Sequence, residues 1–149
     1  MVGRPEFVVL DEPTSGLDPQ GQQFLRQETR RLRDEGRTVL LSTHDVEDAA
    51  RLADDVVIID HGHAVASGSP RALVHEHCRG WRAVVEGPPD PEWAQRSRVT
   101  LVDDGDRTVL YVPDADTVRE MVPQVRILEE RPATLHDAYF MLTGTTLRA

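Results

Sequence analysis

The stretch FVVLDEPTSGLDP, residues 7–19, decides how the rest of this 149-residue sequence is interpreted. Its apolar run at 7–10 is typical of a strand buried on both faces of a parallel sheet. The run ends in two adjacent carboxylates, Asp11 and Glu12, at the strand end where open α/β sheets place their ligands. Because neighbouring residues leaving a strand point to opposite sides, one acid can hold Mg²⁺ through water while the other activates an attacking water. A strand that simply ends in two solvated acids is the alternative.

The next 60 residues or so predict an alternation of helices and strands. Asp18 can cap a helix over 19–35, which we expect to bury Phe24, Leu25 and Leu32. Further strands are predicted at 38–42, 56–59 and 63–66, and further helices at 46–52 and 70–77. Strand–helix alternation of this kind indicates an α/β fold.

Residues 79–149 have a different pattern, so we place a domain boundary between residues 78 and 79, at the dipeptide Arg79-Gly80. Strands are predicted at 81–86, 98–103, 107–112 and 125–128, and helices at 91–96, 115–122 and 135–142. We expect Asp104-Gly105 to form a hairpin turn. From 81 to 128 the element order is β-α-β-β-α-β, the ferredoxin-like order, which predicts a small α+β domain.

The stretch LDEPTSGLDP, residues 10–19, resembles the Walker B motif and D-loop of ABC ATPases, a group of P-loop NTPases. The resemblance implies that Asp11 coordinates Mg²⁺ and that Glu12 is the general base of ATP hydrolysis. It also implies that the D-loop runs along the interface between two nucleotide-binding domains. The residues that we assign to cofactor binding on this basis are Asp11, Ser15, Gly16 and Asp18.

His44 follows the strand predicted at 38–42 directly, within the tetrapeptide STHD of residues 42–45. This segment resembles the switch region, or H-loop, of the same family, whose histidine contacts the γ-phosphate. An imidazole at that place can donate to a phosphate oxygen and couple it to Glu12. His44 is therefore the second catalytic candidate beside Glu12. The remaining histidines have no such context, and a pair at 75 and 77 does not make a metal site.

The resemblance continues to the end of the sequence. Residues 65–70 resemble the closing hairpin and helix of the ABC domain, and residues 131–144 are similar to the C-terminal tail of bacterial ABC-2-type and drug-resistance exporters. The implied organisation is the C-terminal half of a P-loop NTPase parallel-sheet domain at 1–78, followed by the accessory domain of an exporter-type subunit at 79–149. In that group the accessory domain is expected to support dimerisation or regulation.

The motif that grips the phosphates is missing from the sequence. A P-loop, GxxxxGK[ST], cradles phosphates with backbone N–H groups and a lysine. All 17 basic residues here are arginine, and neither a Gln-loop nor an LSGGQ-like signature is present. We therefore expect a partial or truncated chain. The family hydrolyses ATP, but this chain alone is expected neither to bind ATP and Mg²⁺ tightly nor to be active.

Composition and resemblance together indicate the partners. The formal charge of −9 argues against nucleic acid as a partner. The single cysteine, Cys78, fits a reducing cytoplasm. The resemblance implies a second nucleotide-binding domain, a membrane permease, and a cytoplasmic position at the inner face of the cell membrane through that permease.

Two alternatives to a transport ATPase stay open. In the first, the ATPase motifs are idle and residues 80–149 act as an interaction or regulatory module. In the second, the sequence derives from a soluble ABC ATPase of repair or translation, against which the exporter-like tail and the acidic charge both weigh. Nucleotide binding tests the first alternative, and co-purification with a permease tests the second.

Overall fold

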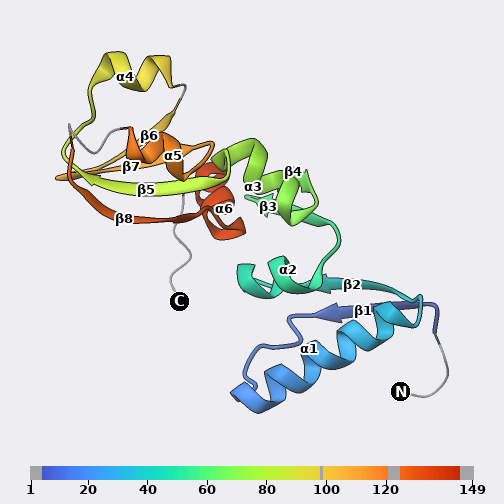
Figure 1. Cartoon of the computed structure of the whole chain (residues 1–149). Coiled ribbons are helices and arrows are strands. Elements are labelled where there is room, and N and C mark those ends of the chain that lie inside the picture. Colours follow the sequence, from blue (N-terminus) through green and yellow to red (C-terminus); the bar gives the residue numbers. More distant parts are fainter. Residues whose placement is uncertain (1–4, 98, 121–124, 145–149) are drawn as a thin grey trace. The chain divides into compact units, whose positions relative to one another are not determined.

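The computed structural model describes residues 5–97, 99–120 and 125–144, and it divides into two compact units, Met1–Asp54 and Asp55–Ala149. The first unit contains β1 (Phe7–Asp11), α1 (Pro19–Asp34), β2 (Thr38–Ser42) and α2 (Val46–Leu52). The second contains β3 (Val56–Asp60), β4 (His63–Gly68), α3 (Pro70–Cys78), β5 (Trp81–Glu86), α4 (Pro91–Arg96), β6 (Thr100–Asp104), β7 (Arg107–Val112), α5 (Ala115–Arg119), β8 (Ile127–Pro132) and α6 (Leu135–Thr143) (Figure 1).

The first unit is a two-stranded parallel sheet, β1–β2, that packs on α1. The parallel pairing places Asp11 opposite Ser42 at the carboxyl ends of the two strands. α1 begins where expected, because the carboxylate of Asp18 accepts a hydrogen bond of 2.7 Å from the amide of Gly21. The predicted strands at 7–10 and 38–42 and their parallel arrangement are confirmed.

One expectation about α1 is wrong. Phe24 is 65% exposed, whereas the buried side chains of this helix are Thr29 and Leu32, with Leu25 half-buried. Leu25, Thr29 and Leu32 follow one another at intervals of four and three residues, which is the spacing of a single helix face. Phe24 lies one position outside this stripe, and its ring therefore faces away from the sheet.

One face of the β1–β2 sheet is apolar and uncovered in the part of the chain that the structure describes. Phe7, Val9 and Leu40 are between 55% and 61% exposed, and Val9 lies directly opposite Leu40. Parallel sheets are ordinarily covered on both faces. The next strand along the chain, β3, does not extend this sheet but pairs with β4 in a separate antiparallel hairpin.

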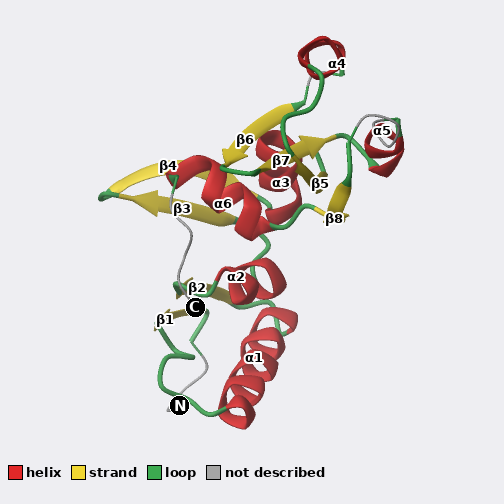
Figure 2. Ribbon diagram, turned by 90° about the vertical axis from the view of Figure 1, so that its left-hand side faces the viewer, coloured by secondary structure: helices red, strands yellow, loops and turns green. Residues whose placement is uncertain are grey.

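The strands β5 to β8 form an antiparallel sheet in the order β6-β7-β5-β8. Their core joins Trp93 of α4 and Val118 of α5 to Val85 and Leu110 of the sheet, so that both helices cover the same face. α3 and α6 pack against each other and lie on the other side of the sheet (Figure 2). The predicted ferredoxin-like order is thus confirmed. None of the described helices is long and apolar enough to span a membrane.

Several predicted bounds differ from the structure, most of them by one or two residues. β8 extends to residue 132 rather than 128, because the charged residues at 129–131 continue the edge pairing with β5. The hairpin residues are Gly105 and Asp106, one position later than expected, and Gly105 adopts a φ of 75° that suits glycine. β6 begins at residue 100, and residue 98 of the predicted strand, like residues 121 and 122 of the helix predicted at 115–122, lies outside the described residues. The predicted domain boundary after residue 78 coincides with the passage from α3 to β5 and stays a prediction, since the compact units divide after residue 54.

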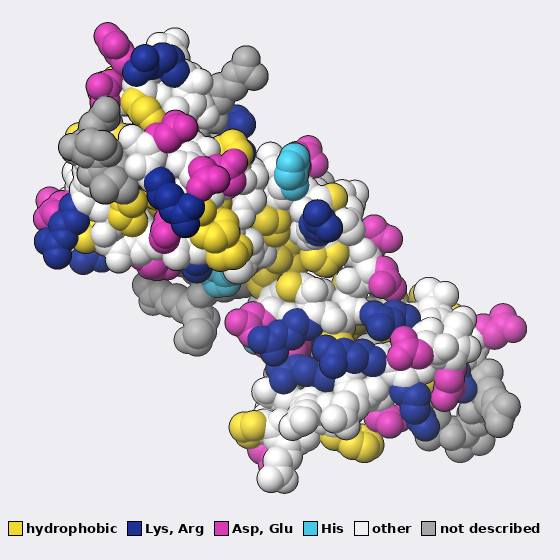
Figure 3. All heavy atoms as spheres, in the orientation of Figure 1, with side chains coloured by type: hydrophobic (Ala, Val, Ile, Leu, Met, Phe, Trp, Pro, Cys, Tyr) yellow, Lys and Arg dark blue, Asp and Glu magenta, His cyan; other side chains and the backbone are white. Residues whose placement is uncertain are grey.

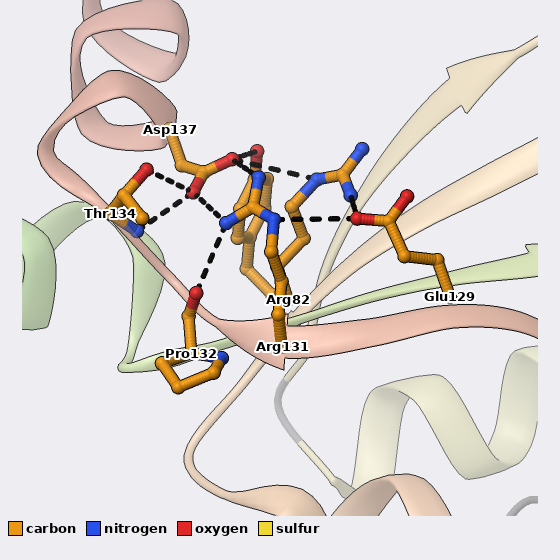
Figure 4. A network of polar contacts seen from close by, with 7 residues as sticks. Arg82, Glu129, Arg131, Pro132, Thr134 and Asp137 are labelled. Carbon is orange, nitrogen blue, oxygen red and sulfur yellow. Dashed lines mark hydrogen bonds and ion pairs between the residues drawn. The ribbon is translucent and has the colours of Figure 1, made fainter.

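The carboxylate of Asp137 ties α6 to the four-stranded sheet (Figure 4). Arg131 donates to it at 2.6 and 2.9 Å, and the amide and hydroxyl of Thr134 donate at 2.7 and 2.8 Å, which completes a capping box. The hydroxyl of Tyr111 lies 3.4 Å away on the sheet. Asp137 is only 4% exposed, so these partners are what makes its burial tolerable.

Candidate catalytic site at the ends of β1 and β2

Four polar residues meet at the carboxyl ends of β1 and β2. Asp11 is the last residue of β1 and Ser42 the last of β2, and the parallel register places them side by side. Glu12 and His44 follow these strands, and Nδ1 of His44 lies 2.8 Å from Oε2 of Glu12. The structure therefore brings Asp11, Glu12 and His44 together, and the roles assigned to them stay predictions.

The backbone of Glu12 is held in an unusual conformation. Its φ of 43° lies in the left-handed region, which residues other than glycine rarely adopt. The amide of Glu12 donates to the carbonyl oxygen of Ser42 at 3.1 Å and to its hydroxyl oxygen at 3.0 Å. Backbone strain of this kind persists where the surroundings enforce it, and it is frequent at functional sites. At Glu12 it accompanies a side chain that contacts His44.

The carboxylate of Asp11 has a different partner from that of Glu12. Its Oδ1 accepts a hydrogen bond from the hydroxyl of Ser42. Among the described residues Oδ2 of Asp11 has no hydrogen-bond donor. The two adjacent acids therefore have different partners: Asp11 is fixed by a serine and keeps a free oxygen, and Glu12 contacts a histidine.

The remaining candidates, Ser15, Gly16 and Asp18, form the turn from β1 to α1. The amide of Ser15 donates to the carbonyl of Glu12 at 3.1 Å, and Gly16 adopts a φ of 71°. The carboxylate of Asp18 caps α1. Within the described residues no hydrogen bond joins these three side chains to Asp11, Glu12 or His44, so this turn contacts the catalytic candidates only through the backbone of Ser15.

The donor set at Asp11 suits magnesium. The described residues contain no group of three or more His, Cys, Asp or Glu side chains that could hold a metal by themselves. Mg²⁺ is usually bound through one or two carboxylates, with water and substrate phosphates as its other ligands. A single carboxylate with one free oxygen fits that pattern. The triphosphate of ATP has fewer binding groups here, because the sequence contains neither a lysine nor a P-loop pattern that could bind its phosphates.

Sequence reasoning gave no role to Ser42, although it lies within the segment that carries His44. Among the described residues, Ser42 has the one side chain that hydrogen-bonds to both acidic residues, through the carboxylate of Asp11 and the amide of Glu12. The signal that could have found it is the register of two parallel strands. A polar residue at the end of β2 must lie beside the acid that ends β1.

Comparisons with known proteins agree with the resemblance seen in the motifs. No family model matches the chain. The Nod factor export ATP-binding protein I of Rhizobium sp. (strain N33) is 35% identical over 97% of this chain and 49% of its own length. The proteins of the same name from Mesorhizobium japonicum and Paraburkholderia xenovorans are each 34% identical, over 97% and 99% of this chain and 44% and 50% of their own lengths.

The chain thus spans about half the length of the curated relatives it matches. A solved structure described as the ATP-binding subunit of an ABC transporter is 32% identical, with a TM-score of 0.46, over 49% of this chain and 30% of that one. The sequence matches confirm the family resemblance: this chain corresponds to the C-terminal portion of an ABC ATP-binding subunit, and the relatives that match it are named as export proteins.

Proposed function

We propose that this chain supplies the hydrolytic side of the ATP site in an ABC transporter subunit of the exporter type. The observation that carries the proposal is the 2.8 Å contact between Nδ1 of His44 and Oε2 of Glu12, beside Asp11 at the end of the same strand. Glu12 acts as the general base that orients and deprotonates the attacking water. Both nitrogens of an imidazolium donate, so His44 can hold Glu12 with Nδ1 while Nε2 reaches a phosphate oxygen.

Asp11 is the residue that would hold Mg²⁺, through its free oxygen Oδ2. When bound, the ion neutralises charge on the β- and γ-phosphates. The phosphate cradle itself must come from a P-loop outside this sequence. Glu12, His44 and Asp11 act only once that cradle is present, and the chain alone binds ATP too weakly to hydrolyse it.

For the whole protein we propose a second nucleotide-binding domain as one partner, facing the turn that contains Ser15, Gly16 and Asp18. The other partner is a membrane permease, which holds the subunit at the cytoplasmic face of the membrane. The motif resemblance and the export function in the relatives' names support both partners. The acidic charge of −9 supports the absence of a nucleic-acid partner.

The proposal is tested by reconstituting the missing half. The chain is fused to the part of the Rhizobium relative that it does not match, where the family resemblance places the P-loop, and Mg-ATP hydrolysis is measured for this P-loop fusion and for the chain alone. We expect hydrolysis only by the fusion, and a loss of at least about 100-fold in Glu12→Gln. Glu35→Gln is the matched control, because this acid is exposed at the far end of α1 and should leave the rate unchanged. Equal rates in Glu12→Gln and the unmodified fusion would refute the role of Glu12.

A second candidate function is favoured by the fold of residues 79–149. This segment contains a four-stranded antiparallel sheet with its own hydrophobic core. Such a unit could serve as an interaction or regulatory module while the ATPase motifs are idle. A fusion that folds and binds ATP but never hydrolyses it, together with retention of a partner by the unmodified chain, would favour this candidate.

A further inference from the structure

We propose that Ser42 is a positioning residue of the hydrolytic site, which fixes the carboxylate of Asp11 and the backbone of Glu12 through one hydroxyl group. Its Oγ donates to Oδ1 of Asp11 and accepts from the amide of Glu12 at 3.0 Å. A serine hydroxyl has one hydrogen to donate and two lone pairs to accept with, so both bonds form at once. The proposal rests on the proposed function, because it concerns the same two acids.

The backbone of Glu12 explains why a second acceptor matters there. With a φ of 43°, Glu12 occupies a conformation that its neighbours must enforce. The carbonyl oxygen of Ser42 already accepts from the Glu12 amide at 3.1 Å, and the hydroxyl adds a second acceptor on the same residue. Ser42 therefore holds the turn that directs the Glu12 side chain toward His44.

The carboxylate of Asp11 gains orientation from the same hydroxyl. With Oδ1 engaged by Ser42, rotation of the carboxylate about its bond to Cβ is restricted, and Oδ2 remains the oxygen available to a cation. Ser42 is itself fixed, because it is paired with Asp11 in the β1–β2 ladder. The register of β1 and β2 thus fixes the position of Ser42, and the side chain of Ser42 in turn fixes Asp11 and Glu12.

The residues from 42 to 44 hold Glu12 at both of its ends. Ser42 contacts the amide, and His44 contacts the carboxylate at 2.8 Å. Alanine at position 42 would keep the backbone contact but lose both hydroxyl bonds, whereas threonine would keep the hydroxyl. The side chain of Ser42 is exposed, which leaves room for the additional methyl group of threonine.

The first test measures amide hydrogen exchange, residue by residue, in the full 149-residue chain. In Ser42→Ala we expect exchange of the Glu12 amide to accelerate about three- to tenfold, the effect of losing one hydrogen bond. Ser42→Thr should stay near the unmodified rate. Thr38→Val is the matched control, because Thr38 lies on the same face of β2 as Ser42. Its hydroxyl has no hydrogen-bond partner among the described residues.

Three outcomes overturn the proposal in this test. Exchange at Glu12 could be unchanged in Ser42→Ala, or Ser42→Thr could behave like Ser42→Ala, which would exclude a role of the hydroxyl. Exchange could also rise throughout β1, β2 and α1, which would make Ser42 a residue of general stability. Acceleration confined to Glu12 and its neighbours in the turn supports positioning.

The second test uses the P-loop fusion and separates this proposal from the proposed function. We expect Ser42→Ala to lower kcat about ten- to hundredfold and to raise the Mg²⁺ concentration that gives half-maximal activity, with an unchanged KM for ATP. Ser42→Thr should restore both. An inactive unmodified fusion refutes the proposed function, whereas normal kcat in Ser42→Ala alongside an inactive Glu12→Gln refutes only the role of Ser42.

Discussion

At the scale of single residues, Asp137 is a buried carboxylate of the second unit whose pKa is shifted by its hydrogen-bond partners. Burial by itself raises the pKa of this carboxyl, but hydrogen bonds from Arg131 and Thr134 outweigh burial and hold the pKa below its usual value. A carboxylate whose pKa is lower in the folded than in the unfolded state stabilises the fold above the unfolded pKa, about 4. That stabilisation is lost as the pH falls through the lowered pKa.

We therefore expect Asp137→Asn to lower the free energy of unfolding of the second unit by about 2 kcal/mol at pH 7, the loss of charge-assisted hydrogen bonds. The variant should also lose the part of the pH dependence below pH 4 that Asp137 causes. Urea unfolding followed by tryptophan fluorescence measures both, because Trp81 and Trp93 lie in this unit. Asp116→Asn is the control, since its ion pair with Arg119 is exposed and should contribute little. An unchanged midpoint in Asp137→Asn would show that the network is dispensable.

Cys78 gives a second prediction at this scale. Burial, together with the negative charge of Asp137, raises the pKa of its thiol to about 12, although the positive charge of Arg131 opposes this rise. Because the thiolate is the reactive form, we expect alkylation by iodoacetamide to be at least about 100-fold slower in the native chain than in urea. Mass spectrometry of the labelled chain measures the two rates. Comparable rates would mean that α3 opens readily from the sheet.

At the scale of elements, one ion pair joins α1 to α2, in a region where arginine side chains gather (Figure 3). Nε of Arg26 lies 2.5 Å from Oδ1 of Asp48, whose side chain is 1% exposed and whose Oδ2 lacks a partner among the described residues. Arg26→Met would leave an unpaired buried charge, at a cost of about 3 kcal/mol. The double variant with Asp48→Leu should recover much of this loss, because both charges are removed.

Amide exchange across α2 is the measurement, with Arg51→Met as the control. The pair of Arg51 with Glu47 is exposed, so its loss should change exchange by less than about threefold. If Arg26→Met and the double variant exchange alike, the charge of Asp48 is not what destabilises α2. This outcome would assign the effect to the lost packing of the arginine stem.

Features that depend on neighbouring residues could be predicted from the sequence, whereas contacts between residues far apart in the sequence could not. The helix start at Asp18 depends on neighbouring residues, and this cap forms as expected. The association of Glu12 with His44 spans 32 positions and was found only through the resemblance to a known motif. Phe24 was misplaced because helix periodicity identifies a stripe but not which edge of it meets the sheet.

Other features depended on contacts that no local pattern encodes. The charged residues at 129–131 belong to β8, although charged residues are not typical of a strand. They are accommodated because β8 is an edge strand, on which ion pairs such as Arg82–Glu129 form. The contact of Ser42 with Asp11 depends on the register of β1 and β2. The ion pair of Asp48 with Arg26 depends on how α1 and α2 pack. Sequence patterns therefore identified elements and motif residues, whereas the side chains that support them needed the three-dimensional structure.

At the scale of the whole chain, the four-stranded sheet and the β1–β2 sheet differ in how completely they are covered. The four-stranded sheet has helices on both faces, whereas β1–β2 exposes Phe7, Val9 and Leu40 on one face. Because protection from exchange follows local burial and packing, we expect amides of β2 to exchange at least about tenfold faster than those of β7. Hydrogen exchange with mass spectrometry measures both strands in the same molecule.

Amide exchange in the P-loop fusion tests why one face of β1–β2 is uncovered. If the open face is where the other half of the subunit packs, the fusion should slow exchange in β2 and leave β7 unchanged, since the sheet containing β7 is already covered. Leu40→Thr in the fusion should remove part of that protection, because a smaller, polar side chain packs poorly in a buried sheet face. A single cooperative unfolding transition of the unmodified chain, with equal protection at 38–42 and 107–112, would contradict the prediction. It would mean that the first unit is already stable with its apolar face open to water.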